Sequence, residues 1–134
     1  MIKGFDHVAI PMGQVAAMLA FYKGLGFRIT DDYGKRVYAV HCGDNKINLH
    51  TTEIWQSGRF TLRGHTAQPG CGDFCFVWDA SEATLHNTLK NLHAQIEEGP
   101  VERKGGRNGG ADTGTSVYTR DPDNNLLEFI IYPD

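Results

Sequence analysis

The sequence has no long apolar run, no cluster of basic residues and no set of cysteines that could pair completely. Nothing in it approaches the roughly 18 consecutive apolar residues of a membrane-spanning helix, so we expect no membrane segment. The net charge of −3 arises from 13 basic and 16 acidic residues that are interspersed along the chain. This mixture offers no basic surface of the kind that binds nucleic acid, and we expect no nucleic-acid partner.

Cysteine is also scarce, with three residues in all: Cys42, Cys71 and Cys75. An odd count argues against a disulfide framework, and Cys71 and Cys75 have no second pair beside them that would complete a zinc knuckle. We expect the three side chains to be small buried hydrophobic groups. The first seven residues lack the apolar stretch of a signal peptide, which favours a cytoplasmic protein.

What the sequence does contain is one order of elements that occurs twice. In the first half we expect a strand over 5–10 closed by Pro11, a helix over 15–23, and strands over 27–31, 36–42 and 46–51. In the second half we expect a strand over 73–78, a helix, and strands over 100–104, 115–120 and 126–132. The second helix is predicted to begin after Ser81 as N-cap, with an apolar stripe at Leu85, Leu89, Leu92 and Ile96.

The repeat of strand, helix, strand, strand, strand predicts an α+β protein. At 134 residues the chain has the length of one domain, or of two small half-domains that share a core. We predict a single domain over 1–134, with module 1 at about 1–52, a connector over 53–70 and module 2 at about 71–134. Within module 2, the glycine-rich stretch 105–114 is predicted to be a loop that covers a site.

The most distinctive stretch lies near the C-terminus, where residues 120–125 (Arg-Asp-Pro-Asp-Asn-Asn) separate two β-forming runs. Pro122 fixes φ for a turn, and Asp and Asn side chains bond their neighbouring backbone. Because side chains alternate along a strand, Glu128 shares a face with Leu126 and Ile130. Both faces of this strand are apolar, so we expect Glu128 to be enclosed. An enclosed carboxylate is costly unless it meets a cation, a metal or hydrogen-bond donors. The alternative is a carboxylate at a strand edge that reaches solvent or an arginine.

Four polar residues fall on matching strand positions when the two halves are superposed. His7 lies opposite Asp73 in the first strands, and Asn48 lies opposite Glu128 in the last strands; His50 shares the face of Asn48. One imidazole, two carboxylates and an amide or second imidazole suit a divalent Mn, Fe, Ni, Co or Zn ion. For His7 the alternative is a core histidine whose ring bonds a backbone carbonyl.

Four motifs in this chain resemble the vicinal oxygen chelate superfamily, the group of glyoxalases, bleomycin-resistance proteins and extradiol dioxygenases. They are Asp6-His-Val-Ala-Ile10, Phe21-Tyr-Lys-Gly-Leu-Gly-Phe27, Lys46-Ile-Asn-Leu-His50, and the run 118–129 that ends in Glu128-Phe129. The resemblance covers nearly the whole chain and is closest to small glyoxalase-domain-containing proteins. It implies two βαβββ modules whose curved mixed sheets form a trough around one divalent metal, with ligands from the first and last strand of each module.

Carried over by position, the resemblance implies metal ligands at His7 and Glu128. Asp73 stands where many members have histidine and is expected to be an oxygen ligand. Asn48 stands where glyoxalases carry glutamate, and His50 is the expected replacement for this weak amide ligand. The implied metal site is therefore His7, His50, Asp73 and Glu128. Glu128, or Asp73 where it binds no metal, is the expected catalytic proton shuttle.

The resemblance implies a metal-dependent lyase of the lactoylglutathione lyase type that acts on a small α-oxoaldehyde or related carbonyl compound. The metal would hold two adjacent substrate oxygens and stabilise the developing enolate. One alternative is an extradiol-type dioxygenase with Fe(II) on His7, His50 and Glu128. A second is a drug-binding dimer of the bleomycin-resistance type, without metal. Since the sheets leave open edges, a homodimer is also implied.

Overall fold

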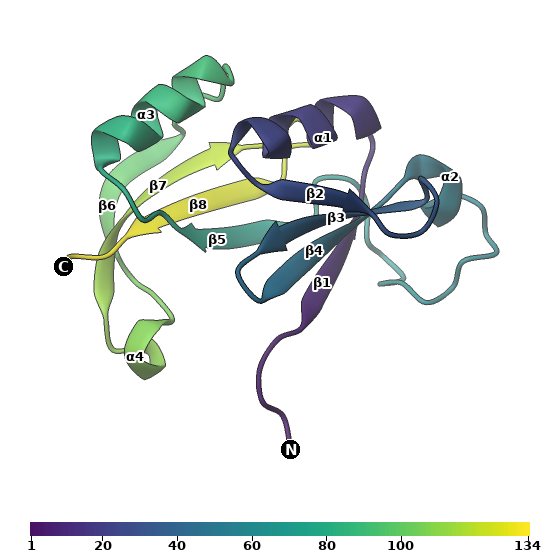
Figure 1. Ribbon diagram of the computed structural model, residues 1–134, viewed down its shortest axis with the longest axis horizontal. Helices are drawn as coiled ribbons and strands as arrows, with labels where there is room; N and C mark the ends of the chain where they lie inside the picture. The colour runs from purple at the N-terminus through teal and green to yellow at the C-terminus, as the bar shows by residue number, and fades with distance from the viewer. The chain divides into compact units, whose positions relative to one another are not determined.

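The computed structural model describes residues 1–134, which divide into two compact units, Met1–Gly72 and Asp73–Asp134. Each unit contains one four-stranded sheet and one ten-residue helix (Figure 1). Strands and helices follow one another in the predicted order in both units, so the α+β class and the two βαβββ modules are confirmed. None of the helices is long and apolar enough to span a membrane.

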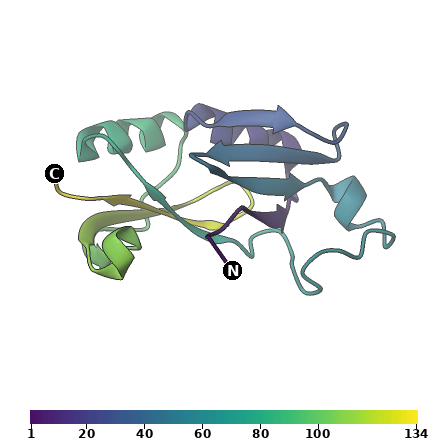
Figure 2. The same ribbon diagram turned by 60° about the horizontal axis from the view of Figure 1, so that its bottom comes forward.

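The first unit is a mixed sheet with the strand order β1-β4-β3-β2, whose strands Figure 2 shows side by side. β1 runs parallel to β4, and the other neighbouring pairs are antiparallel. Its elements are β1 (His7–Pro11), α1 (Val15–Gly24), β2 (Arg28–Asp31), β3 (Val37–Cys42), β4 (Asn45–His50) and the short α2 (Thr52–Trp55).

The second unit repeats this topology, with the strand order β5-β8-β7-β6 and the parallel pair β5 and β8. Its elements are β5 (Asp73–Val77), α3 (Glu82–Asn91), β6 (Glu98–Lys104), the short α4 (Arg107–Gly110), β7 (Thr113–Arg120) and β8 (Leu126–Ile131). The Ser81 side chain accepts a hydrogen bond from the Thr84 backbone and so caps α3 as predicted.

Strand register confirms the predicted match between the halves. His7 pairs with Lys46 in the first sheet, and Asp73 pairs with Leu126 in the second. Asn48 and Glu128 each lie two residues further along β4 and β8. They are therefore equivalent positions of the two sheets.

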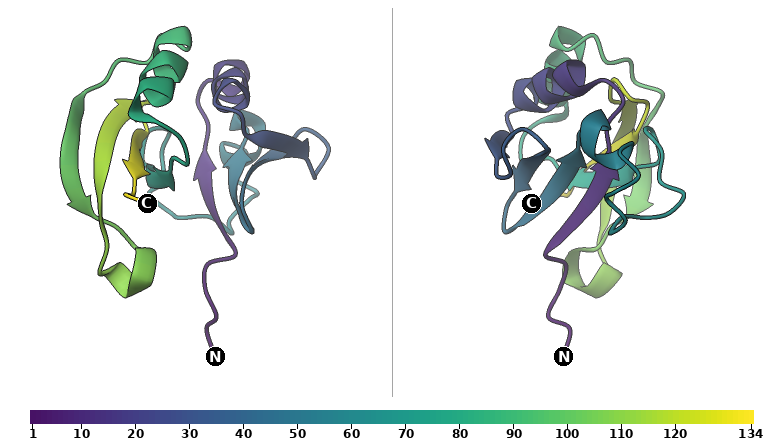
Figure 3. Two further views of the ribbon diagram at one scale, coloured as in Figure 1. Left: turned by 60° about the vertical axis from the view of Figure 1, so that its left-hand side comes forward. Right: turned by 90° about the vertical axis from the view of Figure 1, so that its right-hand side faces the viewer.

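Each unit buries one face of its sheet together with its long helix. In the first unit the buried residues include Met18 and Tyr22 of α1 and Val40, Ile47 and Leu49 of the sheet. In the second they include Leu85 and Leu89 of α3, Val117, Leu127 and Phe129, and Figure 3 shows α3 alongside its sheet. Asn48 falls between two of these buried residues, and so does Glu128. Alternation therefore turns both toward the opposite face of their sheets.

Several predicted boundaries are wrong, each for a local reason. β1 begins at His7, two residues after the predicted start, and includes Pro11 as its last residue, because an edge strand tolerates a residue that lacks an N–H group. α3 ends at Asn91, and the left-handed backbone of His93 (φ 56°) directs the chain away, so Ile96 lies outside the helix. β6 begins at Glu98, two residues before the predicted strand, and includes an irregular pairing after Glu98.

Asp121 organises the turn between β7 and β8. Its Oδ1 accepts hydrogen bonds from the backbone N–H groups of Asp123 and Asn125, both at 3.0 Å, and its Oδ2 accepts one from Asn125 Nδ2 at 2.8 Å. Asp121, Asp123 and Asn125 are all buried, so these donors have little access to bulk water. The neighbouring Arg120 pairs with Glu97 at 3.1 Å and not with the aspartates of the turn.

We predict that Asp121→Ala lowers the free energy of unfolding by about 2–4 kcal/mol, because three buried donors lose their acceptor and each unpaired donor costs about 1–3 kcal/mol. Urea unfolding followed by circular dichroism measures the change. The matched control is Asp44→Ala, an exposed aspartate of the turn between β3 and β4, which should change the stability by less than about 0.5 kcal/mol. Equal small losses in both variants would contradict the role of Asp121.

Candidate functional site

Glu128 lies on the face of the second sheet opposite to Leu127 and Phe129. It is half-buried on the interior strand β8, paired in register with Cys75 of β5 on one side and with Tyr118 of β7 on the other. The Ser116 hydroxyl donates to Glu128 Oε2 at 2.5 Å, a length typical of a charge-assisted hydrogen bond. The predicted alternative of an edge carboxylate is wrong, since β8 is an interior strand.

Cys75 is a second donor beside the Glu128 carboxylate, and it is exposed, as is Cys71, so the prediction of buried cysteines is wrong for both. Although part of Cys75 reaches solvent, the protein atoms around its sulfur remove much of its hydration. This partial desolvation, followed by the charge of Glu128 and the hydrogen bond to it, raises the pKa of Cys75 to about 12. Cys75 is therefore a neutral thiol at physiological pH.

Tyr118 completes the group of donors around Glu128. Its hydroxyl oxygen accepts a hydrogen bond from Arg103 Nε at 3.0 Å, and the guanidinium lies 5.6 Å from the centre of the phenol ring. Desolvation, together with the hydrogen bond and charge of Glu128, raises the pKa of Tyr118, and the contact with Arg103 opposes this shift. A hydroxyl, a thiol and a phenol thus surround one carboxylate.

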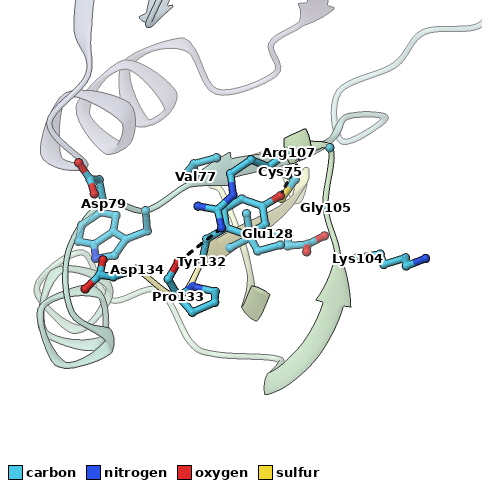
Figure 4. A pocket seen from close by; sticks show the side chains of 13 residues that line it. Cys75, Val77, Asp79, Lys104, Gly105, Arg107, Glu128, Tyr132, Pro133 and Asp134 are labelled. Carbon is cyan, nitrogen blue, oxygen red and sulfur yellow. Dashed lines mark hydrogen bonds between the residues drawn. The ribbon is translucent and has the colours of Figure 1, made fainter. Parts of the chain in front are cut away.

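A cavity of about 920 Å³ adjoins this group and is formed entirely by the second unit (Figure 4). Its lining combines apolar or aromatic side chains with charged ones: Val77, Trp78, Ile130 and Tyr132 on one hand, and Asp79, Lys104, Arg107, Glu128 and Asp134 on the other. The cavity is large enough for a small organic molecule next to the Glu128 carboxylate.

The loop 105–112 borders this cavity and is held to the C-terminal strand by Arg107. The Arg107 guanidinium lies 4.1 Å from the centre of the Tyr132 ring, and its Nε donates to Asp112 at 2.5 Å. That contact lowers the pKa of Asp112. A Cβ atom on Gly105 would lie 1.6 Å from the Tyr132 hydroxyl, so only glycine allows the loop to approach this closely.

In the first unit, His7 is not a core histidine, because 46 % of its side chain is exposed. Its Nδ1 is hydrogen-bonded to the Asp6 carboxylate at 2.6 Å. With the proton placed on Nδ1, the Nε2 atom carries a lone pair. Metal-binding histidines commonly use this arrangement, in which a carboxylate holds the opposite ring nitrogen. The alternative of a buried structural histidine is therefore wrong.

Asn48 and His50 share a face of β4 but have different surroundings. The Asn48 side-chain oxygen is buried and has no hydrogen-bond partner, which is uncommon in folded proteins and unfavourable. His50 is 7 % exposed, and its ring packs edge-on against Phe60 with 5.1 Å between the centres. Burial, and to a lesser extent the charge of Arg63, lowers the pKa of His50, so its ring is neutral at pH 7.

The predicted ligand set remains a prediction. Asp73 and Glu128 share one face of the second sheet, and His7, Asn48 and His50 share one face of the first. The structure contains no group of three His, Cys, Asp or Glu side chains placed to hold one metal ion.

Sequence reasoning missed the donors around Glu128. Cys75 is two residues after Asp73, and Ser116 and Tyr118 are two residues apart on the strand next to Glu128. The sequence shows which residues of one strand share a face, because side chains alternate with a period of two. This period does not show which strands are neighbours in the sheet. Arg63 was missed as well, because no repeated pattern marks it.

We predict that Cys75 is alkylated by iodoacetamide at pH 8 at least ~100-fold more slowly than a free cysteine, because its raised pKa leaves very little thiolate. Glu128→Gln removes the nearby negative charge, lowers the pKa of Cys75 and should accelerate its alkylation several-fold. Asp73→Asn is the matched control, with a smaller effect because the charge of Asp73 contributes less. Mass spectrometry of the labelled peptide over pH 7–10 measures the rates, and an unchanged rate in Glu128→Gln would contradict the contact.

Comparison with known proteins agrees with this fold. The chain is 35 % identical over 134 residues to the glyoxalase domain-containing protein RDO1 of Mycosarcoma maydis. This match covers 99 % of this chain and 70 % of that protein. It is 31 % identical to the virulence protein STM3117 of Salmonella typhimurium, over 98 % of this chain and 85 % of that protein. The crystal structure of STM3117 matches with a TM-score of 0.84 over 99 % of both chains.

A more distant solved structure, the lactoylglutathione lyase of Agrobacterium tumefaciens, has a TM-score of 0.71 and 20 % identity over 98 % of this chain and 95 % of that one. At this identity the similarity concerns the fold alone. A sequence profile of the Glyoxalase/Bleomycin resistance protein/Dioxygenase superfamily matches residues 4–129, nearly the entire chain. The protein therefore belongs to the Glyoxalase/Bleomycin resistance protein/Dioxygenase superfamily.

Proposed function

We propose that this protein is a divalent-metal-dependent lyase of the glyoxalase type that acts on a small carbonyl compound. The observation that carries the proposal is the state of Glu128. One carboxylate oxygen is held by the Ser116 hydroxyl, the carboxylate borders a cavity of about 920 Å³, and neutral donors surround it. A fixed carboxylate beside a small-molecule cavity can take up and return a proton at a substrate carbon.

The chemistry of the donor atoms suits a divalent metal. His7 has its Nδ1 engaged with Asp6, Asn48 has an unpaired buried oxygen, and Glu128 has one oxygen engaged with Ser116. We propose His7, Asp73 and Glu128 as ligands, with the fourth from Asn48 in preference to His50. One neutral nitrogen and several oxygens suit Mn, Co, Ni, Zn or Fe(II). When bound, the metal supplies Lewis-acid stabilisation of the charge that develops on substrate oxygens.

The residues of this chain have distinct roles in the proposed reaction. Ser116 fixes the orientation of the Glu128 carboxylate, which would accept a proton from the substrate carbon. The phenol of Tyr118 and the thiol of Cys75 are hydrogen-bond donors at physiological pH, because both groups have raised pKa values. They can stabilise negative charge near Glu128 without competing for the proton. Trp78 and Ile130 line the apolar side of the cavity, where they would exclude water.

The lyase is favoured over the extradiol dioxygenase by the surroundings of His50. A dioxygenase would need a second histidine on iron. The His50 ring packs against Phe60, with 5.1 Å between the centres. Asn48 next to it offers an unpaired oxygen, so a set with one histidine fits better. The homodimer expected from the open edges of the two sheets stays a prediction.

The first test of this proposal is metal binding. Calorimetric titration of metal-free protein with Mn(II), Co(II), Ni(II) and Zn(II) should reveal about one site per chain. His7→Ala and Glu128→Gln should each weaken binding by at least ~100-fold, since each removes a ligand, and Asp6→Asn by ~10-fold, since it loosens the His7 ring. The control is Asp44→Asn, which removes an exposed carboxylate in the turn between β3 and β4 and should leave the metal affinity unchanged. Full affinity in both ligand variants would exclude this site.

The second test is turnover. Metal-loaded protein should convert an α-oxoaldehyde, or its thiol adduct, to a hydroxy acid without consuming oxygen. Glu128→Gln should lower kcat by ~10²–10⁴-fold, as expected for loss of a general base, and Ser116→Ala by about tenfold because the carboxylate is no longer fixed. Glu102→Gln, an exposed carboxyl of the same unit, is the control. Oxygen uptake with a catechol on Fe(II) would instead indicate a dioxygenase, and saturable binding without turnover a binding protein.

A further inference from the structure

Arg103 of β6 is not among the residues that line the cavity, yet its side chain contacts Tyr118 on the neighbouring strand. Its Nε donates to the Tyr118 hydroxyl oxygen at 3.0 Å, and its Nη1 donates to the backbone oxygen of Glu102 at 2.9 Å. The guanidinium carbon also lies 5.6 Å from the centre of the Tyr118 ring. No carboxylate lies within ion-pair distance of Arg103. The arginine is therefore held by a phenol and not by an acidic side chain.

The contact with Arg103 determines where the Tyr118 hydroxyl proton can go. A phenol oxygen accepts hydrogen bonds through its lone pairs and donates one through its single proton, whereas a guanidinium only donates. Arg103 therefore occupies a lone pair of the phenol oxygen and cannot receive the proton. Glu128 can receive it, because it lies directly opposite Tyr118 in the register of β7 and β8 and is hydrogen-bonded to it.

Two hydroxyl groups of one strand thus act on the Glu128 carboxylate. Ser116 donates to Oε2 at 2.5 Å, and Tyr118 follows it by two residues along β7, so both groups lie on the same face. The terminal torsion of a glutamate is broad, so one hydrogen bond leaves the carboxylate plane free to rotate. A second donor restricts that rotation. The positive charge of Arg103 polarises the phenol and strengthens it as a donor.

We propose that Arg103 is a positioning residue for Glu128: it fixes the Tyr118 hydroxyl so that the proton points to the carboxylate, which is then held in one orientation. Arg103 does not line the cavity, so it has no direct part in the chemistry. Only the effect of this orientation on proton transfer rests on the proposed lyase function. The competing explanation is a direct effect of the Arg103 charge on Glu128, which would not require Tyr118.

The first measurement uses metal-free protein without substrate, so it does not depend on turnover. Glutamate is labelled with ¹³C at the carboxyl carbon, and Glu128→Gln assigns the Glu128 signal in the NMR spectrum. At one fixed pH, Arg103→Gln and Tyr118→Phe should each move this signal. In the Tyr118→Phe background, Arg103→Gln should cause less than about one third of the shift that it causes in the parent, because residues that act through one contact are not additive.

The second measurement is turnover of the metal-loaded protein. Arg103→Gln should lower kcat by about three- to tenfold and leave KM within twofold, because the carboxylate loses its orientation while substrate contacts remain. Arg103→Lys should restore little of this, since lysine keeps the charge but lacks the planar guanidinium. The matched control is Arg120→Gln. Arg120 is an exposed arginine of β7 that pairs with Glu97, and its loss should change neither kcat nor the Glu128 signal.

Two results of the NMR measurement would overturn the proposal. One is an unmoved Glu128 signal in Arg103→Gln, and the other is an equal shift with and without the Tyr118 hydroxyl. The two proposals fail separately. A coupled shift in a protein without turnover would support the positioning role and exclude the lyase, whereas turnover that Arg103→Gln leaves unchanged would support the lyase and exclude the role of Arg103.

Discussion

The alternation of side chains along β8 is the constraint on which the second unit depends. Leu127 and Phe129 are buried, so Glu128 between them must point to the opposite face. A shift of register by one residue would bury a carboxylate under α3 and expose two large hydrophobic side chains. The turn centred on Asp121 helps to prevent that shift, because its three hydrogen bonds fix the position at which β8 begins.

The same register determines what surrounds Glu128. Because β8 is flanked by β5 and β7, the carboxylate meets a thiol, a hydroxyl and a phenol from strands far apart in sequence. Desolvation of the sulfur, followed by the negative charge of Glu128, raises the pKa of Cys75 to about 12, so the cysteine is a donor and not a nucleophile. Exposure alone would have suggested a reactive thiol.

The two units share a topology but have diverged in their polar groups. In the first, the position equivalent to Glu128 is Asn48, whose oxygen is buried without a partner. In the second, the carboxylate has several donors. The segment 53–70 adds a further difference, since it brings an unpaired arginine to the first unit. The unpaired Asn48 oxygen is one of the atoms proposed to bind the metal, because folding leaves its interactions unsatisfied.

The sequence by itself determined the order of elements and the equivalence of the two halves. Apolar periodicity and turn residues predicted both βαβββ modules, the N-cap at Ser81 and the equivalence of Asn48 with Glu128, because these depend on contacts close in sequence or on a period of two. The tertiary structure alone decided which strands are neighbours, and so placed Cys75, Ser116 and Tyr118 around Glu128. It also decided that Cys75 is exposed and that Arg63 has no counter-ion, since burial and charge pairing depend on residues distant in the chain.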